Sequence, residues 1–390
     1  MAFVLRLGLF FSALFIGSGA SLPFMPVWFR AQGLSPTEMA VILASPYFGR
    51  TVFGPLLALW ADLFRLRRTP MALMAAGACL AYAALWAAHG FWGWLTAWLA
   101  GTLLLGALSP LGDVLGMREA RARGVVYAIP RGVGSAAYVI GNVGMGLVLA
   151  RTAPVSVLVW TTAAAALTAV AALWSLPPTP VHDGGERLSG RDLLSGLGGL
   201  LRDPVFMLAI LAIGLIQSTH GFYYSFSTLI WRRQGLGAWT GLLWGCAVAA
   251  EMLFMWFMEP WRRRMGPQRL VAIGGAGAVL RWVALSFAPP LWLLFPIQLL
   301  HAMTYTATFL GSLRLIGQLS PPKAASAAQA LNSAVSGGVL IGLTTVASGP
   351  LFEALGARAY LVMAAIAGIG LVLALALKRP LARRRVGLAS

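Results

Sequence analysis

Long apolar stretches recur along almost the whole chain, and they limit the fold more than any other feature of the sequence. Of the 390 residues, 59% are hydrophobic and only 10% are charged, whereas soluble domains carry about 25% charged residues. A helix needs about 20 mostly apolar residues to cross a bilayer. The sequence therefore predicts an all-α integral membrane protein and excludes a single water-soluble globule. Twelve transmembrane segments can be placed at residues 5–30, 36–61, 69–88, 92–117, 128–150, 154–176, 205–231, 238–260, 267–287, 290–313, 325–352 and 356–378.

The net charge of +18 is divided unevenly between the turns that join these segments. With the N-terminus placed in the cytoplasm, 21 Lys and Arg residues fall on the cytoplasmic side and 5 on the opposite side. Cytoplasmic loops of membrane proteins carry such an excess of Lys and Arg. We therefore predict that both termini are cytoplasmic, that the lipid bilayer is a partner, and that nucleic acid is not.

The longest polar stretch divides the chain into two similar halves. Arg30-Ala-Gln-Gly-Leu34 ends the first predicted helix, and Arg232-Arg-Gln-Gly-Leu236 ends the seventh, 202 residues later. Two related six-helix halves are the layout of the major facilitator fold, in which a substrate lies near the midplane between them. We predict a six-helix bundle at 1–176, a central cytoplasmic loop at 177–204, and a second six-helix bundle with a basic cytoplasmic tail at 205–390.

The turn after the second predicted helix has a charged pattern that resembles the loop signature of this superfamily, Gly-x-x-x-Asp followed by basic residues. Asp62 is followed by Arg65 and Arg68, and Ala58 stands where Gly is usual. A carboxylate at this place can accept hydrogen bonds from arginines and hold a cytoplasmic gate closed. The alternative is a solvated charged turn with no gating role.

Five ionisable residues lie inside apolar stretches, where ionisable side chains are rare. A charge at the bilayer centre costs at least about 2.5–3.5 kcal/mol, so such residues are usually paired and functional. Polar side chains can also serve only to hold transmembrane helices together, but a purely structural buried ion pair is costly to keep. We therefore interpret these five as working parts of a polar interior; they are Asp113, Arg131, Glu251, Arg281 and His301.

Arg50 is a separate case, because no carboxylate on its own helix can pair with it. It lies 12 residues before Asp62, hence about 18 Å along an ideal helix and close to mid-membrane. It either binds an anionic substrate or anchors the helix, and the sequence leaves both roles open.

Helical spacing groups other polar residues with the charged ones. Arg131, Ser135, Tyr138 and Asn142 follow one another at i, i+4, i+7 and i+11, which places them on one face of a helix. Trp244 and Glu251 lie two turns apart on one side of another predicted helix. These faces indicate a cavity lined by aromatic, amide and charged groups.

The eighth to tenth predicted helices carry a series of residues that resembles a known group. They contain Thr240-Gly-Leu-Leu-Trp244, Glu251, Arg281-Trp282 and Gln298-Leu-Leu-His301. This series resembles the phenylpropionate permease family of major facilitator transporters, which is related to lactose permease and to nucleoside–proton symporters. The resemblance covers almost the whole chain and implies proton-coupled import of an aromatic acid.

The charge layout is also similar to that of lactose permease. Asp113 and Arg131 have the 18-residue separation of a carboxylate and an arginine there, and Arg281 and His301 have the 20-residue separation of an arginine and a histidine. The sugar permease has a proton-carrying carboxylate three residues beyond its histidine, and this chain has Thr304 instead. The resemblance therefore leaves Glu251, His301 or Asp113 to carry the proton.

Together these patterns predict a secondary active transporter rather than an enzyme. We expect it to work as a monomer on a small, anionic organic solute and protons, with no metal or cofactor beyond the proton gradient. An excess of Arg over Lys, 27 against 2, suggests a GC-rich bacterial genome and thus the inner membrane. The predicted substrate-binding residues are Arg131, Tyr138, Asn142, Tyr224, Trp244, Arg281 and Gln298.

Four other functions stay open at this point. Drug–proton exporters usually carry Gly-Pro-x-x-Gly-Gly on the fifth helix, and the segment Gly141–Gly146 has no proline, which counts against efflux without excluding it. Neutral sugar or nucleoside import uses the same charge pattern. A multipass membrane enzyme would need a nucleophile or metal motif that the sequence lacks, and a receptor on a transporter scaffold would bind its ligand without flux.

Overall fold

The protein is almost entirely helical, as the apolar stretches predict. The structure, a computed structural model, describes residues 2–180, 198–321 and 324–387. These residues form no β-sheet, and one isolated bridge joins Leu66 to Pro180. Most of the predicted central loop, with Arg187 and Arg191, lies outside the described residues.

Eleven helical segments of the described chain are long and apolar enough to cross a membrane. Each predicted segment overlaps one of them and extends past its ends by at most three residues, and the last two share one helical stretch of 60 residues, Ala325–Arg384. That stretch contains a break at Gly356, whose φ of +56° is a conformation that glycine adopts readily. The twelve predicted crossings thus have a helical counterpart throughout the described chain.

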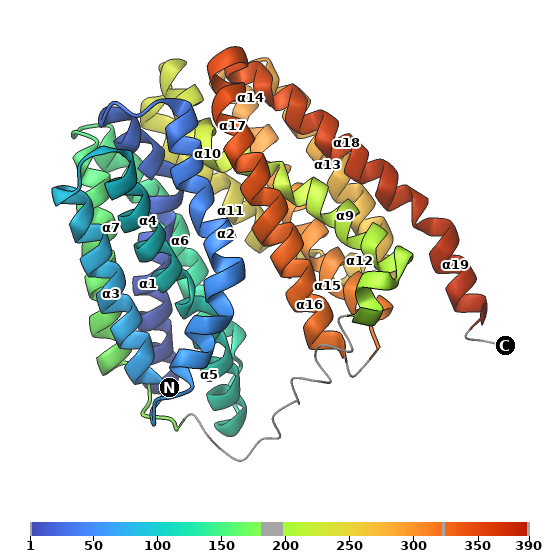
Figure 1. Cartoon of the computed structure of the whole chain (residues 1–390), viewed down its shortest axis with the longest axis horizontal. Coiled ribbons are helices and arrows are strands. Elements are labelled where there is room, and N and C mark those ends of the chain that lie inside the picture. Colours follow the sequence, from blue (N-terminus) through green and yellow to red (C-terminus); the bar gives the residue numbers. More distant parts are fainter. Residues whose placement is uncertain (1, 181–197, 322–323, 388–390) are drawn as a thin grey trace. The chain divides into compact units, whose positions relative to one another are not determined.

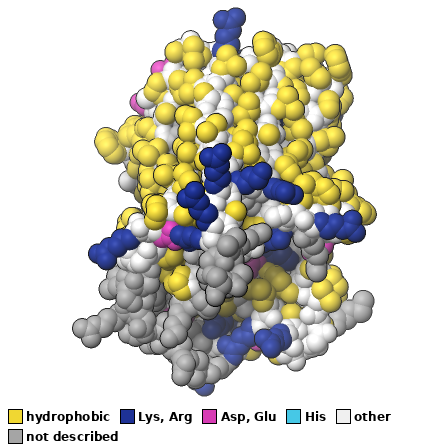
Figure 2. All heavy atoms as spheres, turned by 90° about the vertical axis from the view of Figure 1, so that its right-hand side faces the viewer, with side chains coloured by type: hydrophobic (Ala, Val, Ile, Leu, Met, Phe, Trp, Pro, Cys, Tyr) yellow, Lys and Arg dark blue, Asp and Glu magenta, His cyan; other side chains and the backbone are white. Residues whose placement is uncertain are grey.

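Large apolar side chains cover the outside of these helices. Trp174, Phe287 and Trp92 are 82%, 77% and 74% exposed, whereas soluble monomers rarely expose wide apolar patches. Figure 2 shows a broad hydrophobic region on one face, with Lys and Arg side chains gathered below it. This surface is suited to lipid and supports a multi-pass membrane protein.

The chain divides into two compact units. The first contains residues Met1–Gly185 and Tyr224–Gly245, and the second contains Glu186–Tyr223 and Cys246–Ser390. The unit boundaries thus fall inside α10 (His220–Arg233) and α11 (Thr240–Phe257), the helices drawn in yellow-green and yellow in Figure 1. The predicted division into 1–176 and 205–390 stays a prediction.

The first unit is built around the contact between its first and fifth membrane segments. Its helices are α1 (Ala2–Ala31), α2 (Pro36–Ala61), α3 (Arg68–Ala87), α4 (Gly90–Gly106), α5 (Leu108–Ala122), α6 (Ala128–Leu149) and α7 (Val155–Trp174). A Cβ on Gly19 of α1 would lie 2.3 Å from the carbonyl oxygen of Tyr138, and one on Gly141 of α6 would lie 2.5 Å from that of Ile16. Glycine is therefore required on both helices, because the backbones touch.

The second unit contains the remaining helices and two wider π-helical turns. Its helices are α9 (Pro204–Ser218), α12 (Glu259–Arg264), α13 (Pro267–Ser286), α14 (Leu291–Leu299), α15 (Thr308–Leu319), α16 (Ala325–Ala334), α17 (Ile341–Leu355), α18 (Tyr360–Ala376) and α19 (Lys378–Gly387). The π turns are η2 (Ala302–Ala307) and η4 (Val335–Leu340), and a short 3₁₀ turn lies at Gly356–Ala359; the other, Gly237–Trp239, belongs to the first unit. Because π turns are frequent at functional sites, η2 draws attention to the polar residues around it.

Candidate functional site

The second unit holds a chain of three ionisable side chains from three helical segments. Arg281 lies on α13 and is fully buried, Glu251 lies on α11, and His301 immediately precedes η2. Nη1 of Arg281 lies 2.6 Å from Nδ1 of His301, and Nε2 of His301 lies 3.0 Å from Oε1 of Glu251. We call these residues the Arg281 cluster, and the sequence predicted all three as functional.

The hydrogen bonds of the cluster fix the protonation state of its histidine. A guanidinium has only donors, so Nδ1 of His301 must accept the bond from Arg281. The proton of the ring is then on Nε2, which donates to the carboxylate of Glu251. A neutral ring therefore joins the guanidinium to the carboxyl group, and Thr306 donates a longer bond of 3.3 Å to Oε2 of Glu251.

Neutral groups surround the rest of the buried guanidinium, whose Nε has no hydrogen-bond partner among the described residues. Nη2 of Arg281 donates to Oε1 of Gln298 at 2.7 Å, and the hydroxyl of Tyr223 donates to the same oxygen at 2.8 Å. The guanidinium carbon lies 4.3 Å from the ring centre of Tyr223 and 4.9 Å from that of Trp282. Such contacts stabilise a desolvated cation by about 2 kcal/mol, so Arg281 is held on several sides.

Thr304 extends the cluster to a second histidine. Its hydroxyl accepts a bond of 3.3 Å from Nη1 of Arg281 and lies 3.1 Å from Nε2 of His220. Nδ1 of His220 lies 3.0 Å from the carbonyl oxygen of Gln217 and must donate to it. In the neutral ring, Nε2 of His220 is therefore an acceptor, and the Thr304 hydroxyl has two acceptors within reach, this nitrogen and the carbonyl oxygen of His301 at 3.3 Å. The sequence singled out Thr304 only as a departure from lactose permease.

Two local backbone features bring these side chains together. Pro296 lies inside α14 and cannot supply a backbone hydrogen bond, and the regular helix ends at Leu299, just before the π turn. A Cβ on Gly274 of α13 would lie 1.9 Å from Oγ1 of Thr308. Only glycine allows α13 to approach this closely, and this approach brings Arg281 within reach of His301.

The first unit contains the second predicted ion pair. Nε of Arg131 on α6 donates to Oδ1 of Asp113 on α5 at 3.2 Å, and the hydroxyl of Tyr127 donates to the same oxygen at 2.5 Å. The guanidinium also lies over the ring of Phe15, 4.5 Å from its centre. A Cβ on Gly134 would lie 2.7 Å from the Phe15 ring, so glycine makes room for this stacking. The two charged side chains are about one-third exposed.

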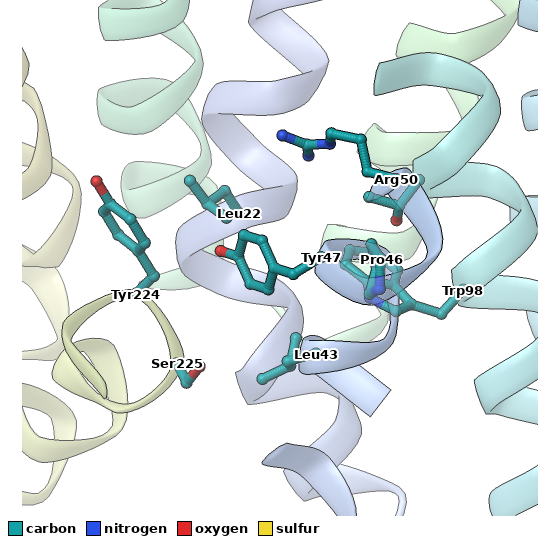
Figure 3. A pocket seen from close by; sticks show the side chains of 9 residues that line it. Leu22, Leu43, Pro46, Tyr47, Arg50, Trp98, Tyr224 and Ser225 are labelled. Carbon is teal, nitrogen blue, oxygen red and sulfur yellow. The ribbon is translucent and has the colours of Figure 1, made fainter. Parts of the chain in front are cut away.

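A pocket in the first unit gathers aromatic side chains around one cation. It has an empty volume of about 430 Å³, including the part open to solvent. Figure 3 shows the Arg50 side chain extending from α2 beside Tyr47, with Tyr224 across the space from Tyr47. All of its lining residues belong to the first unit, and they are Leu22, Leu43, Pro46, Tyr47, Arg50, Trp98, Thr102, Tyr224 and Ser225. We call this the Arg50 pocket.

The other predicted substrate residues lie in different surroundings. Asn142 is fully buried, and its Nδ2 donates to the carbonyl oxygen of Tyr138 on the same helix at 3.1 Å. Trp244 is buried too; its indole donates to Thr228 at 2.9 Å, and its ring centre lies 6.1 Å from that of Tyr224. Of the predicted substrate residues, Arg281 and Gln298 meet in the second unit and Tyr224 lines the Arg50 pocket. Tyr138 and Asn142 line neither the cluster nor the pocket.

The predicted cytoplasmic gate lies in the turn between α2 and α3. Asp62 caps the end of α2 through its backbone, and among the described residues it makes no ion pair with Arg65 or Arg68. Burial and the nearby Arg118 lower the pKa of Arg67, while Asp62 opposes this shift. The turn is hydrogen-bonded to the segment after α7, because the Arg67 amide donates to the carbonyl oxygen of Thr179 at 2.9 Å. Asp62 thus acts electrostatically on Arg67 in this structure.

Sequence reasoning missed several residues of these sites. It named Arg50 without a role, and it did not single out Tyr47, Trp98 or Thr102. A tyrosine or tryptophan in an apolar stretch gives no signal of its own, because such residues are common in membrane helices. The only sign of this pocket in the sequence was the charge of Arg50, with which no carboxylate on its own helix can pair.

Comparisons with known proteins agree with the helical layout. The MFS_1-like family model matches residues 4–362. A protein of Escherichia coli strain K12 named as a probable 3-phenylpropionic acid transporter is 29% identical over 360 residues, which are 90% of this chain and 92% of that protein. The maltose permease of Geobacillus stearothermophilus is 27% identical over 356 residues, 88% of this chain and 86% of the permease.

Solved structures give the same result for the fold. The nucleoside transporter NupG superposes with a TM-score of 0.81 at 16% identity, covering 97% of this chain and 98% of that one. A bacterial homologue of the human lysosomal transporter Spinster, in an inward-facing and unoccupied conformation, gives 0.71 at 13% identity, with 97% and 96% covered. Together with the family match over most of its length, this shows that the chain belongs to the MFS_1-like family and is a multi-pass membrane transporter of the major facilitator superfamily.

Proposed function

We propose that this transporter imports a small organic acid together with a proton by alternating access, in a bacterial inner membrane. The observation that carries the proposal is the Arg281 cluster, in which a buried arginine reaches a carboxylate only through a neutral histidine. A carboxyl group held in this way can exist with or without a proton, and its charge acts on a fully buried cation. Such an arrangement suits a residue whose charge must change during a transport cycle.

Glu251 is the proposed proton site, with His301 as its link to Arg281. When Glu251 is ionised, the cluster is neutral as a whole. When Glu251 binds a proton, His301 loses its anionic acceptor and the charge of Arg281 is left unbalanced. A conformation that offers Arg281 another anion, or water, is then favoured. Only such a difference in free energy between conformations can couple proton binding to movement.

Asp113 and His301 remain second candidates for carrying the proton. Asp113 already accepts bonds from Arg131 and Tyr127 and lies partly open to solvent. His301 would have to lose its bond from Arg281 to take up a second proton, because both ring nitrogens are donors in the charged form. Glu251 needs no such rearrangement, so we place the coupling there.

The proposed substrate class is an aromatic acid. The relative from Escherichia coli that is named for 3-phenylpropionic acid supports this class. A second class, neutral sugars or nucleosides, is favoured by the named maltose permease and by the likeness to NupG. The two classes differ in charge, so one transport assay with both kinds of solute separates them.

The test is substrate uptake into proteoliposomes that contain a trapped pH indicator. With 3-phenylpropionate outside, wild type should acidify the interior faster than protein-free liposomes, through which the undissociated acid also diffuses. Glu251→Gln should lose gradient-driven uptake and keep exchange of labelled for unlabelled substrate, because exchange needs no net proton release. Glu353→Gln, an exposed glutamate at the end of α17, is the matched control and should behave as wild type.

Each other result has a definite meaning. Full gradient-driven uptake by Glu251→Gln would move the proton site to Asp113 or His301. Uptake of maltose or uridine, with none of the acid, would replace the substrate class and leave the coupling site to be tested with the new solute.

A further inference from the structure

Arg50 is a cation in the middle of a membrane helix with no partner among the residues that the structure describes. α2 has 26 residues, and Arg50 lies between its internal prolines Pro46 and Pro55. Its side chain is exposed and makes no hydrogen bond or ion pair in the described part of the chain. An unpaired charge at this depth costs at least about 2.5–3.5 kcal/mol, so a partner from outside the protein is expected.

The other two arginines inside membrane segments already have their partners. Arg131 donates to Asp113, and Arg281 donates to His301, Gln298 and Thr304. A substrate carboxylate could bind either of them only by displacing these groups. Arg50 has no such group to displace among the described residues. Gly106 lies beside its guanidinium, and a Cβ on that glycine would lie 3.9 Å from Nη2 of Arg50.

The walls of the Arg50 pocket suit a flat apolar group beside an anion. Tyr47, Trp98 and Tyr224 contribute aromatic rings, and Leu22, Leu43 and Pro46 contribute aliphatic surface. Trp98 is fixed by the rings of Phe29 and Tyr82, whose centres lie 5.7 and 5.9 Å from its own. Mostly apolar walls with a few polar groups are typical of small-molecule sites, and the lining of this pocket has that composition.

The polar groups of the pocket are few and lie on different helices. Arg50 supplies the one charged group of the lining, and the hydroxyls of Tyr47, Thr102, Tyr224 and Ser225 supply the neutral polar groups. Arginine binds carboxylates through two parallel N–H bonds, which fixes orientation as well as position. A ligand with a single carboxylate and one aromatic ring satisfies both the cation and the walls, whereas a sugar would leave the cation without an anion.

We propose that the Arg50 pocket is the substrate site in the first unit, with Arg50 holding the carboxylate and Tyr47, Trp98 and Tyr224 surrounding the ring of an aromatic acid. This inference rests on the proposed function, whose substrate class it deepens. It transfers the role of carboxylate ligand from Arg131 and Arg281 to Arg50, and it leaves Glu251 with the proton.

The test is equilibrium binding to purified protein of labelled 3-phenylpropionate and, by competition, of its neutral amide. Arg50→Gln should weaken binding of the acid by roughly 10- to 100-fold, as expected for loss of a charge-assisted hydrogen bond. The amide should bind the variant about as well as it binds wild type. The affinity of Arg50→Lys for the acid should fall between that of wild type and that of Arg50→Gln, because lysine keeps the charge but lacks the paired N–H donors of arginine. Arg151→Gln, an exposed arginine outside the pocket, is the control and should bind the acid as wild type does.

A steric variant keeps the test decisive if Arg50→Gln does not fold. Leu43→Trp should fill the pocket and abolish binding of both the acid and the amide. Leu59→Trp places the same change on the outward face of the same helix, where Leu59 is 65% exposed, and should bind both. Wild-type acid binding by Arg50→Gln or by Leu43→Trp would overturn the pocket assignment while the proposed function stands. If wild type binds no aromatic acid, the substrate class itself fails, and the ligand assigned to the pocket fails with it.

Discussion

Arg281 and Arg131 each contact a partner about 20 residues away in the sequence, but their surroundings are very different. Arg281 lies 20 residues before its histidine, and Arg131 lies 18 residues after its aspartate. The Arg281 side chain is fully buried and reaches a carboxylate through a neutral ring, whereas the Arg131 side chain is 35% exposed and touches its carboxylate directly. Similar spacing in the sequence has therefore produced one desolvated, indirect charge pair and one direct pair beside solvent.

The difference teaches which site can respond to a proton. Water near Arg131 and Asp113 screens any change of charge, because exposed pairs interact weakly. The Arg281 cluster is buried, so solvent screens a change of its charge much less. This difference is why we propose the buried cluster as the coupling site and the exposed pair as one that holds helices in place.

The largest expected effect is the loss of the buried guanidinium. Arg281→Ala should lower the free energy of unfolding by about 3–5 kcal/mol, because it leaves Glu251 buried without its cation. Arg131→Ala should lower it by at most about 1 kcal/mol. Unfolding in mixed micelles of detergent and SDS measures both variants on one scale.

A double variant separates loss of charge balance from loss of packing. Arg281→Met with Glu251→Gln removes both charges and should recover much of the stability lost in the single variant, since the remaining groups are neutral. Equal destabilisation by Arg281→Ala and Arg131→Ala would show that burial does not distinguish the two sites.

A smaller effect is expected within the buried cluster, from its two threonines. Thr304→Val removes a hydroxyl that contacts both the guanidinium of Arg281 and the ring of His220, and the loss of a hydrogen bond to a charged group should cost about 1.5–3 kcal/mol. Thr306→Val removes only the long bond to Glu251 and should cost about 0.5–1.5 kcal/mol. The same unfolding assay compares them. A larger loss for Thr306→Val would place the centre of the cluster at Glu251 rather than at Arg281.

The sequence predicted which residues meet in the buried Arg281 cluster better than it predicted how the backbone brings them together. Helix order, the family and the grouping of Arg281, Gln298, His301 and Glu251 followed from apolar length and from the series on three helices, and the family match confirms the family. The π turn at Ala302–Ala307 could not be foreseen, because no residue type marks it. Without that turn, neither the contact of Thr304 with His220 nor that of Thr306 with Glu251 could be placed. The Arg50 pocket was missed for a related reason, since its walls come from distant segments whose meeting depends on tertiary packing.

An ion pair outside the membrane segments extends the comparison to a water-facing site. Asp203 caps α9 by accepting from the amides of Val205 and Phe206 at 2.9 and 3.3 Å, and Arg384 of α19 donates to the same oxygen. Burial alone would raise the pKa of Asp203, but these donors outweigh it and hold that pKa below its ordinary value.

A carboxyl group with a lowered pKa in the folded state stabilises the fold above its unfolded pKa of about 3.9, and the contribution disappears as the pH falls through the folded value. Asp203→Ala should thus lower the free energy of unfolding by about 0.5–2 kcal/mol at pH 7, and Arg384→Ala by at most about 1 kcal/mol. At pH 3 or below, both differences from wild type should shrink. Arg383→Ala is the matched control, because Arg383 is exposed and makes no bond among the described residues. If Arg383→Ala matched Arg384→Ala, or if the loss in Asp203→Ala were as large in acid as at neutrality, the stabilisation would come from the general basic charge of α19 rather than from this pair.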